Sequence, residues 1–401
     1  NTTGQENTAI GPYAMYANTT SSRNVAIGYA ALDAQTTGSG YNTAVGNNAM
    51  TANTDGHSNT AVGANALDAN TTGDANVAVG YNALTAATTG NYNTAVGRAA
   101  LGANTSASDN TAFGYSALPA NTTGTFNTAV GRSTLEASTT SSNNTAVGYG
   151  ALAASTSGSD NNAFGSLALV ANTEGGDNNA FGKQAMNANT TGSGNSAFGH
   201  ASLDANTTGA SNSAFGSGAA GAITTSSYNV AIGGNALSAC TTGDGRNVAI
   251  GQGAMVSNTT GAYNVGIGES ALGSCTSAIG NVAIGATAGD ASTSAASNVL
   301  IGMNAGTELT TGGTNVGVGR ATLGSVTSGT LNTAVGHEAG NNLASGASEN
   351  TCVGSSAKTG ATNSSHAIVL GSGITAASGN DRFSFGKASN IVHNVFTSNA
   401  S

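Results

Sequence analysis

The 401-residue sequence has no Trp, two Pro and three Cys, and only 7% of its residues are charged. An average soluble protein has about 25% charged residues and about 7% Gly, whereas this chain has 60 Gly. Collagen needs Gly at every third position with abundant Pro, and a transmembrane helix needs ~20 consecutive apolar residues. The sequence has neither pattern, so both classes are excluded and we expect no membrane insertion.

The remaining composition argues against disorder and against nucleic-acid binding. Apolar residues make up 38% of the chain and are spread evenly, whereas disordered chains are poor in them. Nine Lys and Arg against 18 Asp and Glu give a net charge of −9, so we expect no basic stripe and no nucleic-acid partner. The first residue is Asn1 and no leader pattern follows it, which predicts a fragment or a processed product.

A five-residue pattern recurs along the chain: Asn, a variable residue, a small residue that is usually Ala, a large apolar residue and Gly. It occurs 21 times between Asn7 and Asn350, with 17 intervals of 17 residues and three of 18. We number each unit from its Asn, as positions 0 to 16. Such a fixed period is the signature of a stacked repeat architecture.

Each unit combines one strand pattern with turn patterns. Position 3 is Val, Ile or Phe in all 21 copies, position 2 is Ala in 17, position 7 is Ala in 18, and position 8 is Leu or Met in 16. Positions 11 to 14 often read Asn-Thr-Thr-Gly, which favours a turn. The Ala-Leu segment is too short for a stable helix, so it is predicted to be a short extended run or a tight corner. The sequence therefore predicts an all-β parallel β-solenoid, or β-roll, of about 21 coils.

The period ends near residue 371, which predicts a solenoid shaft over residues 1–371 and a separate cap or tip over residues 372–401. In the shaft, Gly at position 4 is expected where φ is positive or where a side chain would clash with the next coil. The Asn column at position 0 is expected to form an amide ladder between coils, with a row of sugar-binding amides as the alternative.

Strand alternation places positions 1 and 3 on one face and position 2 on the other. We expect position 3 to fill the core and the Ala face to pack against copies of the same chain, most economically in a homotrimer. Phe at position 3 then predicts a wider core in the middle coils. Gly at position 8 in three later coils predicts a narrower cross-section there, at Gly289, Gly306 and Gly340.

The residues that usually carry chemistry are scattered. Glu174 and Asp177 are close within one loop, where a solvated loop is the simpler interpretation, and the five His lie far from any zinc-like spacing. Cys240 and Cys275 both occupy position 11, two coils and so about 10 Å apart, beyond disulfide reach, and free thiols are expected. We therefore expect no enzyme activity, no catalytic residues, no metal and no cofactor. Paired Thr at positions 12 and 13 suggest ice binding, which their turn location disfavours.

The repeats resemble known fibrous proteins. Asn24-Val25-Ala26-Ile27-Gly28 is similar to the repeat of trimeric autotransporter adhesin heads, and the half that reads Ala-Leu-x-Ala-Asn-Thr-Thr-Gly is more similar to phage tail-fibre repeats. The stretch from Asn380 to Asn390, with its continuation to Ser401, resembles the segment before the self-cleaving intramolecular chaperone of tail fibres and tailspikes. The adhesin resemblance implies a trimeric β-roll. The tail-fibre resemblance implies a chaperone that is removed from the mature product.

These observations predict a structural, homotrimeric phage tail fibre, extracellular on the virion, that attaches to a host cell-surface glycan or outer-membrane protein. Two alternatives stay open, a trimeric autotransporter-type adhesin on a bacterial cell surface and a self-assembling extracellular filament. Receptor contact is expected on loops or on the terminal segment, although a cap over the last coil is an equally good interpretation of the latter. The candidate receptor-binding residues are Arg382, Phe383, His393 and Phe396.

Overall fold

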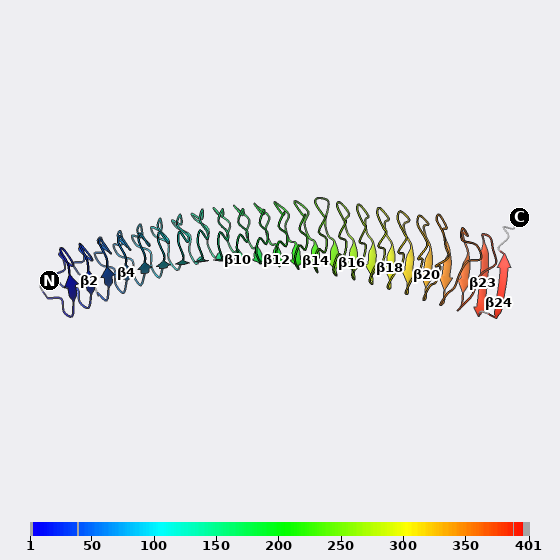
Figure 1. Cartoon of the computed structure of the whole chain (residues 1–401), viewed down its shortest axis with the longest axis horizontal. Helices are drawn as coiled ribbons and strands as arrows, with labels where there is room; N and C mark the ends of the chain where they lie inside the picture. Colours follow the sequence, from blue (N-terminus) through cyan, green and yellow to red (C-terminus); the bar gives the residue numbers. More distant parts are fainter. Residues whose placement is uncertain (1–2, 38–39, 388, 396–401) are drawn as a thin grey trace. The chain divides into compact units, whose positions relative to one another are not determined.

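A computed structural model describes residues 3–37, 40–387 and 389–395, and the chain divides into two compact units, Asn1–Asn195 and Ser196–Ser401. Each unit is a parallel β-solenoid with a 17-residue period, and the described residues contain no helix. Within each unit, successive three-residue strands lie side by side (Figure 1). The predicted all-β parallel solenoid is confirmed.

The strands of the first unit are β1 (Thr8–Ile10), β2 (Val25–Ile27), β3 (Thr43–Val45), β4 (Thr60–Val62), β5 (Val77–Val79), β6 (Thr94–Val96), β7 (Thr111–Phe113), β8 (Thr128–Val130), β9 (Thr145–Val147), β10 (Asn162–Phe164) and β11 (Asn179–Phe181). Those of the second unit are β12 (Ser196–Phe198), β13 (Ser213–Phe215), β14 (Val230–Ile232), β15 (Val248–Ile250), β16 (Val265–Ile267), β17 (Val282–Ile284), β18 (Val299–Ile301), β19 (Val316–Val318), β20 (Thr333–Val335), β21 (Thr351–Val353), β22 (Ile368–Leu370), β23 (Arg382–Lys387) and β24 (Asn390–Val395).

The strands pair in strict register, each residue beside its equivalent in the next coil. Ala44 of β3 lies beside Ala61 of β4, and Ala231 of β14 beside Ala249 of β15 even though one extra residue separates that pair of coils. The parallel ladder continues beyond residue 371, because β23 pairs with β22 in parallel. The antiparallel strand β24 then follows β23 as a hairpin.

The predicted amide ladder at position 0 is confirmed. In the middle of the first unit, Asn127 is fully buried and its Oδ1 accepts a hydrogen bond from the backbone N–H of Asn144 at 3.1 Å. Its Nδ2 donates to Oδ1 of Asn110 at 3.2 Å and to the carbonyl of Ser141, across the coil, at 2.8 Å. In the second unit the same column runs from Asn212 to Asn350 and ends on the backbone N–H of Ala367. The buried amides therefore satisfy each other and fix the register between coils.

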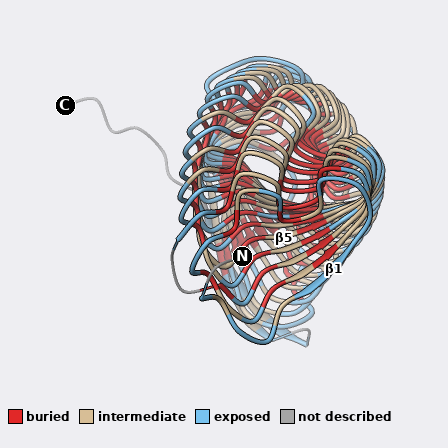
Figure 2. Ribbon diagram, turned by 90° about the vertical axis from the view of Figure 1, so that its left-hand side faces the viewer, coloured by how far each residue is buried: buried red, intermediate tan, exposed pale blue. Residues whose placement is uncertain are grey.

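The core assignment predicted for positions 2 and 3 is wrong. Ala at position 2 is fully buried inside its own coil, as Ala129 shows, whereas position 3 points outward and Phe113 is 56% exposed. Figure 2 shows that buried residues line the inner side of the coils. Inside the coil, the position 2 side chain of the strand packs against the opposite wall. That wall consists of Ala at position 7, Leu or Met at position 8 and the residue at position 11, and these side chains fill the interior of the 17-residue coil. Only a small residue fits at position 2 against that wall.

The Phe residues therefore do not widen the core. Phe164 and Phe181 lie on the outer face and stack on each other, with ring centroids 4.7 Å apart and planes 9° from parallel. This nearly parallel stacking follows from the strict register, which places equivalent side chains one strand spacing apart.

The narrowing predicted at Gly289 and Gly306 is offset by a side chain at position 2, whereas at Gly340 position 2 is Ala334 and the neighbouring side chains are Leu323 and Leu343. Leu300 replaces the usual Ala and is fully buried. A Cβ added to Gly289 would lie 3.0 Å from Leu300 Cδ1, and one added to Gly306 would lie 2.8 Å from Leu300 Cδ2. The large side chain has moved from one wall of the coil to the other, so the interior stays filled.

The Ala-Leu segment was predicted to be a short extended run or a tight corner, and it forms tight turns. The backbone of these turns has positive φ at two residues that are not Gly in most coils. Positions 6 and 8 have positive φ, as at Asn65 (φ 53°) and Leu67 (φ 53°). Asn tolerates this conformation, but a buried Leu in it is strained by about 1–3 kcal/mol. Leu67 is fully buried, so packing of its side chain compensates for the strain.

The role predicted for Gly at position 4 is confirmed at Gly63. Its φ is +133°, and a Cβ at this residue would lie 2.6 Å from the carbonyl oxygen of Gly80. We expect Gly63→Ala to lower the free energy of unfolding by about 1–3 kcal/mol because it adds both backbone strain and a steric clash. Denaturant unfolding followed by circular dichroism measures the change. Gly234→Ala is the matched control, because a Cβ at Gly234 meets nothing within 4 Å, and an equal loss in both variants would contradict the assignment.

The amide ladder makes a second prediction. Asn127→Ala leaves the N–H of Asn144 and the carbonyl of Ser141 without their buried partner, and we expect a loss of about 2–4 kcal/mol in unfolding free energy. The exposed Asn47→Ala serves as the control and should change the free energy by less than about 0.5 kcal/mol. Similar effects at the two sites would show that the ladder contributes little.

Candidate functional site

The C-terminal hairpin of β23 and β24 carries the residues predicted to bind a receptor. Phe383 pairs in register with Ile368 and Phe385 with Leu370, so the two Phe continue the outward positions 1 and 3. Their ring centroids are 5.6 Å apart, and Phe385 is 45% exposed. Near its C-terminal end, the outer face of the second unit therefore carries a pair of aromatic side chains, with Asn394 and Val392 of β24 paired beside them.

The structure separates the four predicted residues. Arg382 precedes Phe383 in the register of the inward Asn column, and its Nε atom is buried. His393 lies opposite Ser384, which continues the inward position 2, and Ser384 Oγ is 2.7 Å from His393 Nδ1. Arg382 and His393 thus share the side of the hairpin on which Ser384 is buried, with His393 itself exposed, whereas Phe383 faces outward. Phe396 lies outside the described residues.

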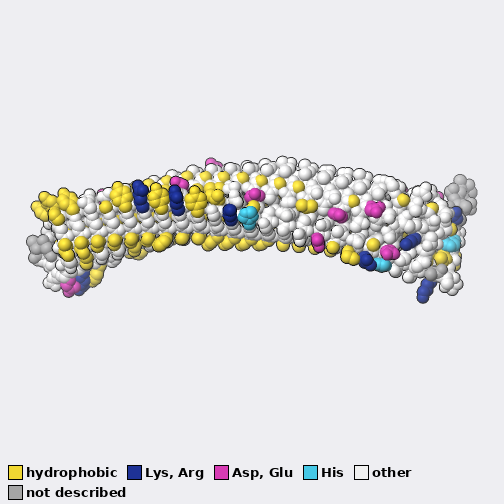
Figure 3. Space-filling view, in the orientation of Figure 1, with side chains coloured by type: hydrophobic (Ala, Val, Ile, Leu, Met, Phe, Trp, Pro, Cys, Tyr) yellow, Lys and Arg dark blue, Asp and Glu magenta, His cyan; other side chains and the backbone are white. Residues whose placement is uncertain are grey.

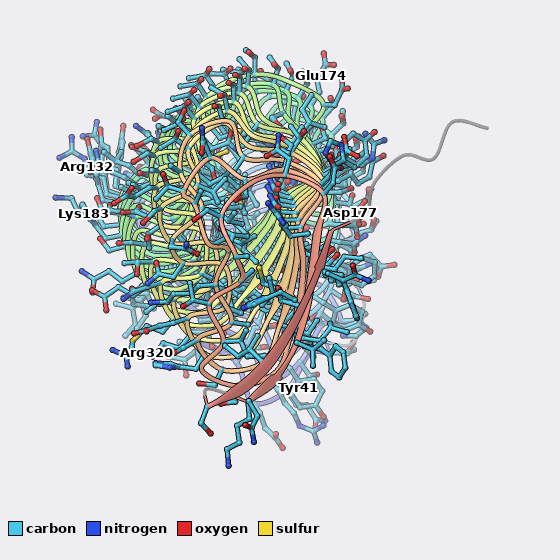
Figure 4. All side chains as sticks on the ribbon, turned by 90° about the vertical axis from the view of Figure 1, so that its right-hand side faces the viewer. Tyr41, Arg132, Glu174, Asp177, Lys183 and Arg320 are labelled. Atoms are coloured by element: carbon cyan, nitrogen blue, oxygen red, sulfur yellow. The ribbon has the colours of Figure 1, made fainter. Side chains whose placement is uncertain are left out.

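Titratable groups form pairs on the surface rather than a compact centre. His366 Nε2 lies 3.2 Å from Glu349 Oε2, and His366 Nδ1 lies 3.7 Å from Asp381 Oδ1. Glu174 and Asp177 are exposed and lie on a different side of the first unit from Arg132 and Lys183 (Figure 4). No group of three or more His, Cys, Asp and Glu able to hold a metal ion occurs in the part of the chain that the structure describes.

The three cysteines are buried free thiols, as predicted. Cys352 lies in the core of its own coil rather than at a contact between chains, because position 2 points inward. Burial raises the pKa of the Cys352 thiol to about 12 and that of Cys275 to about 11. Since the thiolate is the reactive form, these side chains are protonated and inert at neutral pH.

Thr at position 12 uses its hydroxyl within the solenoid. Thr122 Oγ1 donates to the carbonyl of Thr139 in the next coil at 3.0 Å, and Thr276 does the same to Thr293 at 3.0 Å. The preceding Asn closes the turn, because Asn121 Nδ2 donates to the carbonyl of Gly124 at 2.9 Å. These contacts give the Asn-Thr-Thr-Gly motif a structural role in stacking the coils.

The outward side chains form two kinds of row. The first is the apolar row, defined as the third residue of every strand from β1 to β11 in the first unit and from β12 to β22 in the second, which is Val, Ile, Phe or Leu throughout. Figure 3 shows an unbroken line of apolar side chains along the first unit. Sequence reasoning placed these residues in the core, because alternation alone does not tell which face points inward.

The second kind of row consists of aromatic and basic side chains at position 5. All ten Tyr are exposed, and Tyr81, Tyr115 and Tyr149 alternate along the first unit with Arg98 and Arg132. Sequence reasoning missed this row. Comparing position 5 from coil to coil would have found it, since the five residues are 17 apart in the sequence.

No protein-family model matches this chain, and no curated protein matches it either. None of the described residues belongs to a helix long and apolar enough to span a membrane.

Proposed function

We propose that this chain is a structural, non-enzymatic fibre of a phage tail, assembled as a homotrimer, that attaches the virion to a host cell surface. The apolar row is the observation that carries the proposal. Soluble monomers rarely expose an extended apolar surface, and such a surface marks a site of association.

A second copy of the same chain is the partner that fits the apolar row best. The row repeats with the period of the strands, one Val, Ile, Phe or Leu in each coil, so a partner must repeat at the same spacing to cover it. Another copy of the chain has the same spacing because it has the same repeats. Cyclic symmetry about an axis along the row lets every copy bury the same face, and the similarity to trimeric adhesin heads favours three copies.

The hairpin supports attachment at one end of the second unit. It leaves Phe385 exposed beside Phe383, at the point where the parallel ladder changes to antiparallel pairing. Exposed aromatic side chains are enriched where proteins bind partners. A cell-surface glycan or an outer-membrane protein of the host is the proposed receptor.

The trimer is tested at the apolar row. We expect static light scattering to give three times the 38.3 kDa of one chain for the unmodified protein. Phe164→Lys with Phe181→Lys places two charges on the outer face and should dissociate the assembly, because buried unpaired charges at an interface are strongly unfavourable. The control is Thr72→Lys with Thr89→Lys, at the exposed position 13. A monomeric mass for the unmodified protein would exclude the trimer.

Attachment is tested by adding fluorescently labelled protein to a panel of bacterial strains and measuring the bound fraction after washing. We expect binding to at least one strain. Phe383→Ser with Phe385→Ser should reduce that binding about tenfold or more, as expected for aromatic residues at the centre of an interface. Tyr92→Ser, an exposed aromatic residue elsewhere, should leave it unchanged. Absence of binding to every strain would contradict the proposed function.

A further inference from the structure

One row of the first unit combines aromatic rings with unpaired positive charge. We call it the Tyr–Arg ladder: Tyr81, Arg98, Tyr115, Arg132 and Tyr149, at position 5 of five successive coils. The Arg98 guanidinium carbon lies 5.8 Å from the ring centroid of Tyr81 and 5.7 Å from that of Tyr115, and Arg132 lies 5.5 Å from Tyr115. Each contact is within the range of a cation–π interaction.

The ladder projects into solvent. Its three Tyr are 46 to 54% exposed, and both Arg are exposed. In Figure 3, apolar and basic side chains alternate along one row of the surface, separate from the apolar row. Arg132 and Lys183, also at position 5, extend outward from the same side of the unit (Figure 4).

The two guanidinium groups have no acidic partner. The side chains of Arg98 and Arg132 make no hydrogen bond and no ion pair with any residue that the structure describes, in contrast to Arg23, whose Nε lies 2.9 Å from Glu6 Oε2. Residues 76–160 contain three acids, and none lies at positions 1 to 8 of its coil, where the ladder stands. These acids are Asp109, Glu136 and Asp160.

This arrangement favours an anionic ligand that is bound edge-on. Stacking against Tyr rings restrains the plane of each guanidinium and leaves its outward N–H groups free for two parallel hydrogen bonds to a carboxylate. Arg98 and Arg132 are two coils apart, a spacing of about 10 Å and roughly the length of two hexose units. The Tyr hydroxyls between them can exchange hydrogen bonds with sugar hydroxyls.

From this geometry we infer that the Tyr–Arg ladder binds an acidic polysaccharide that carries a carboxylate on about every second sugar, with its chain running along the row. Single-stranded nucleic acid fits less well. It has a phosphate at every nucleotide and needs open ring faces for base stacking, whereas the ladder offers two widely spaced cations and the ring faces are occupied by Arg.

The inference deepens the proposed attachment function by naming a receptor class, but the geometry of the ladder stands without it. The Tyr–Arg ladder of one chain is a small binding site, so the affinity of one chain for the polysaccharide should be modest. Several copies of the ladder in one assembly would raise the avidity for a long polysaccharide.

The experiment measures binding of the full chain to hyaluronan, a polymer with a carboxylate on every second sugar, by biolayer interferometry at low salt. We expect binding that weakens as salt is raised. Arg98→Gln with Arg132→Gln should weaken it about tenfold or more, because two charge-assisted contacts are lost. Tyr115→Leu should also weaken it without changing the charge, and Tyr115→Phe should retain most of it.

Arg320→Gln is the matched control, since it removes one charge from position 5 between Met303 and His337 rather than between Tyr residues, and it should bind as the unmodified chain does. Circular dichroism verifies that each variant is folded. The inference is overturned if hyaluronan does not bind, if the double variant binds equally well, if neutral dextran binds as tightly, or if a thirty-residue oligothymidylate binds more tightly.

The two proposals fail separately. Hyaluronan binding without attachment to any strain would remove the attachment function and leave the ladder as a polysaccharide site. Attachment to cells that is unaffected by the Arg98 and Arg132 substitutions, together with no hyaluronan binding, would remove the ladder site and leave the attachment function in place.

Discussion

The buried column of Asn side chains is the interaction on which the rest of the structure depends. The backbone groups that face the interior of a 17-residue coil are shielded from water. Each group left there without a hydrogen-bond partner would lower the free energy of unfolding by about 1–3 kcal/mol. Each Asn accepts the backbone N–H of the next Asn and donates across its own coil, as Asn127 does to Ser141. Equivalent residues are therefore held side by side from coil to coil, even where an extra residue enters a loop.

Strict register also governs the core. Every coil has the same narrow interior. The total side-chain volume inside neighbouring coils is therefore kept, while the position that supplies it changes. Leu300 occupies position 2 where Gly289 and Gly306 lack a side chain, and Ala129 occupies it where Leu135 fills position 8. The fully buried Leu at position 8 adopts a strained backbone with positive φ, which shows how much the interior packing contributes.

The same register turns single surface residues into rows. One Val, Ile or Phe per coil becomes an apolar face, and alternating Tyr and Arg at position 5 become a ladder of cation–π contacts. A surface of this kind is suited to partners that are themselves periodic. Association with further copies of the chain and binding of a polysaccharide would both depend on this periodicity.

The sequence by itself determined the period, the parallel solenoid, the strain-relieving Gly at position 4 and the amide ladder, because each depends on a local pattern repeated many times. It did not determine which strand face is the interior. Alternation separates positions 2 and 3, but the choice between them depends on the volume contributed by positions 7, 8 and 11 on the opposite wall. Only the tertiary structure decided that Ala129 is buried and Phe113 exposed, and that Arg382 and His393 share the side of the hairpin on which Ser384 is buried.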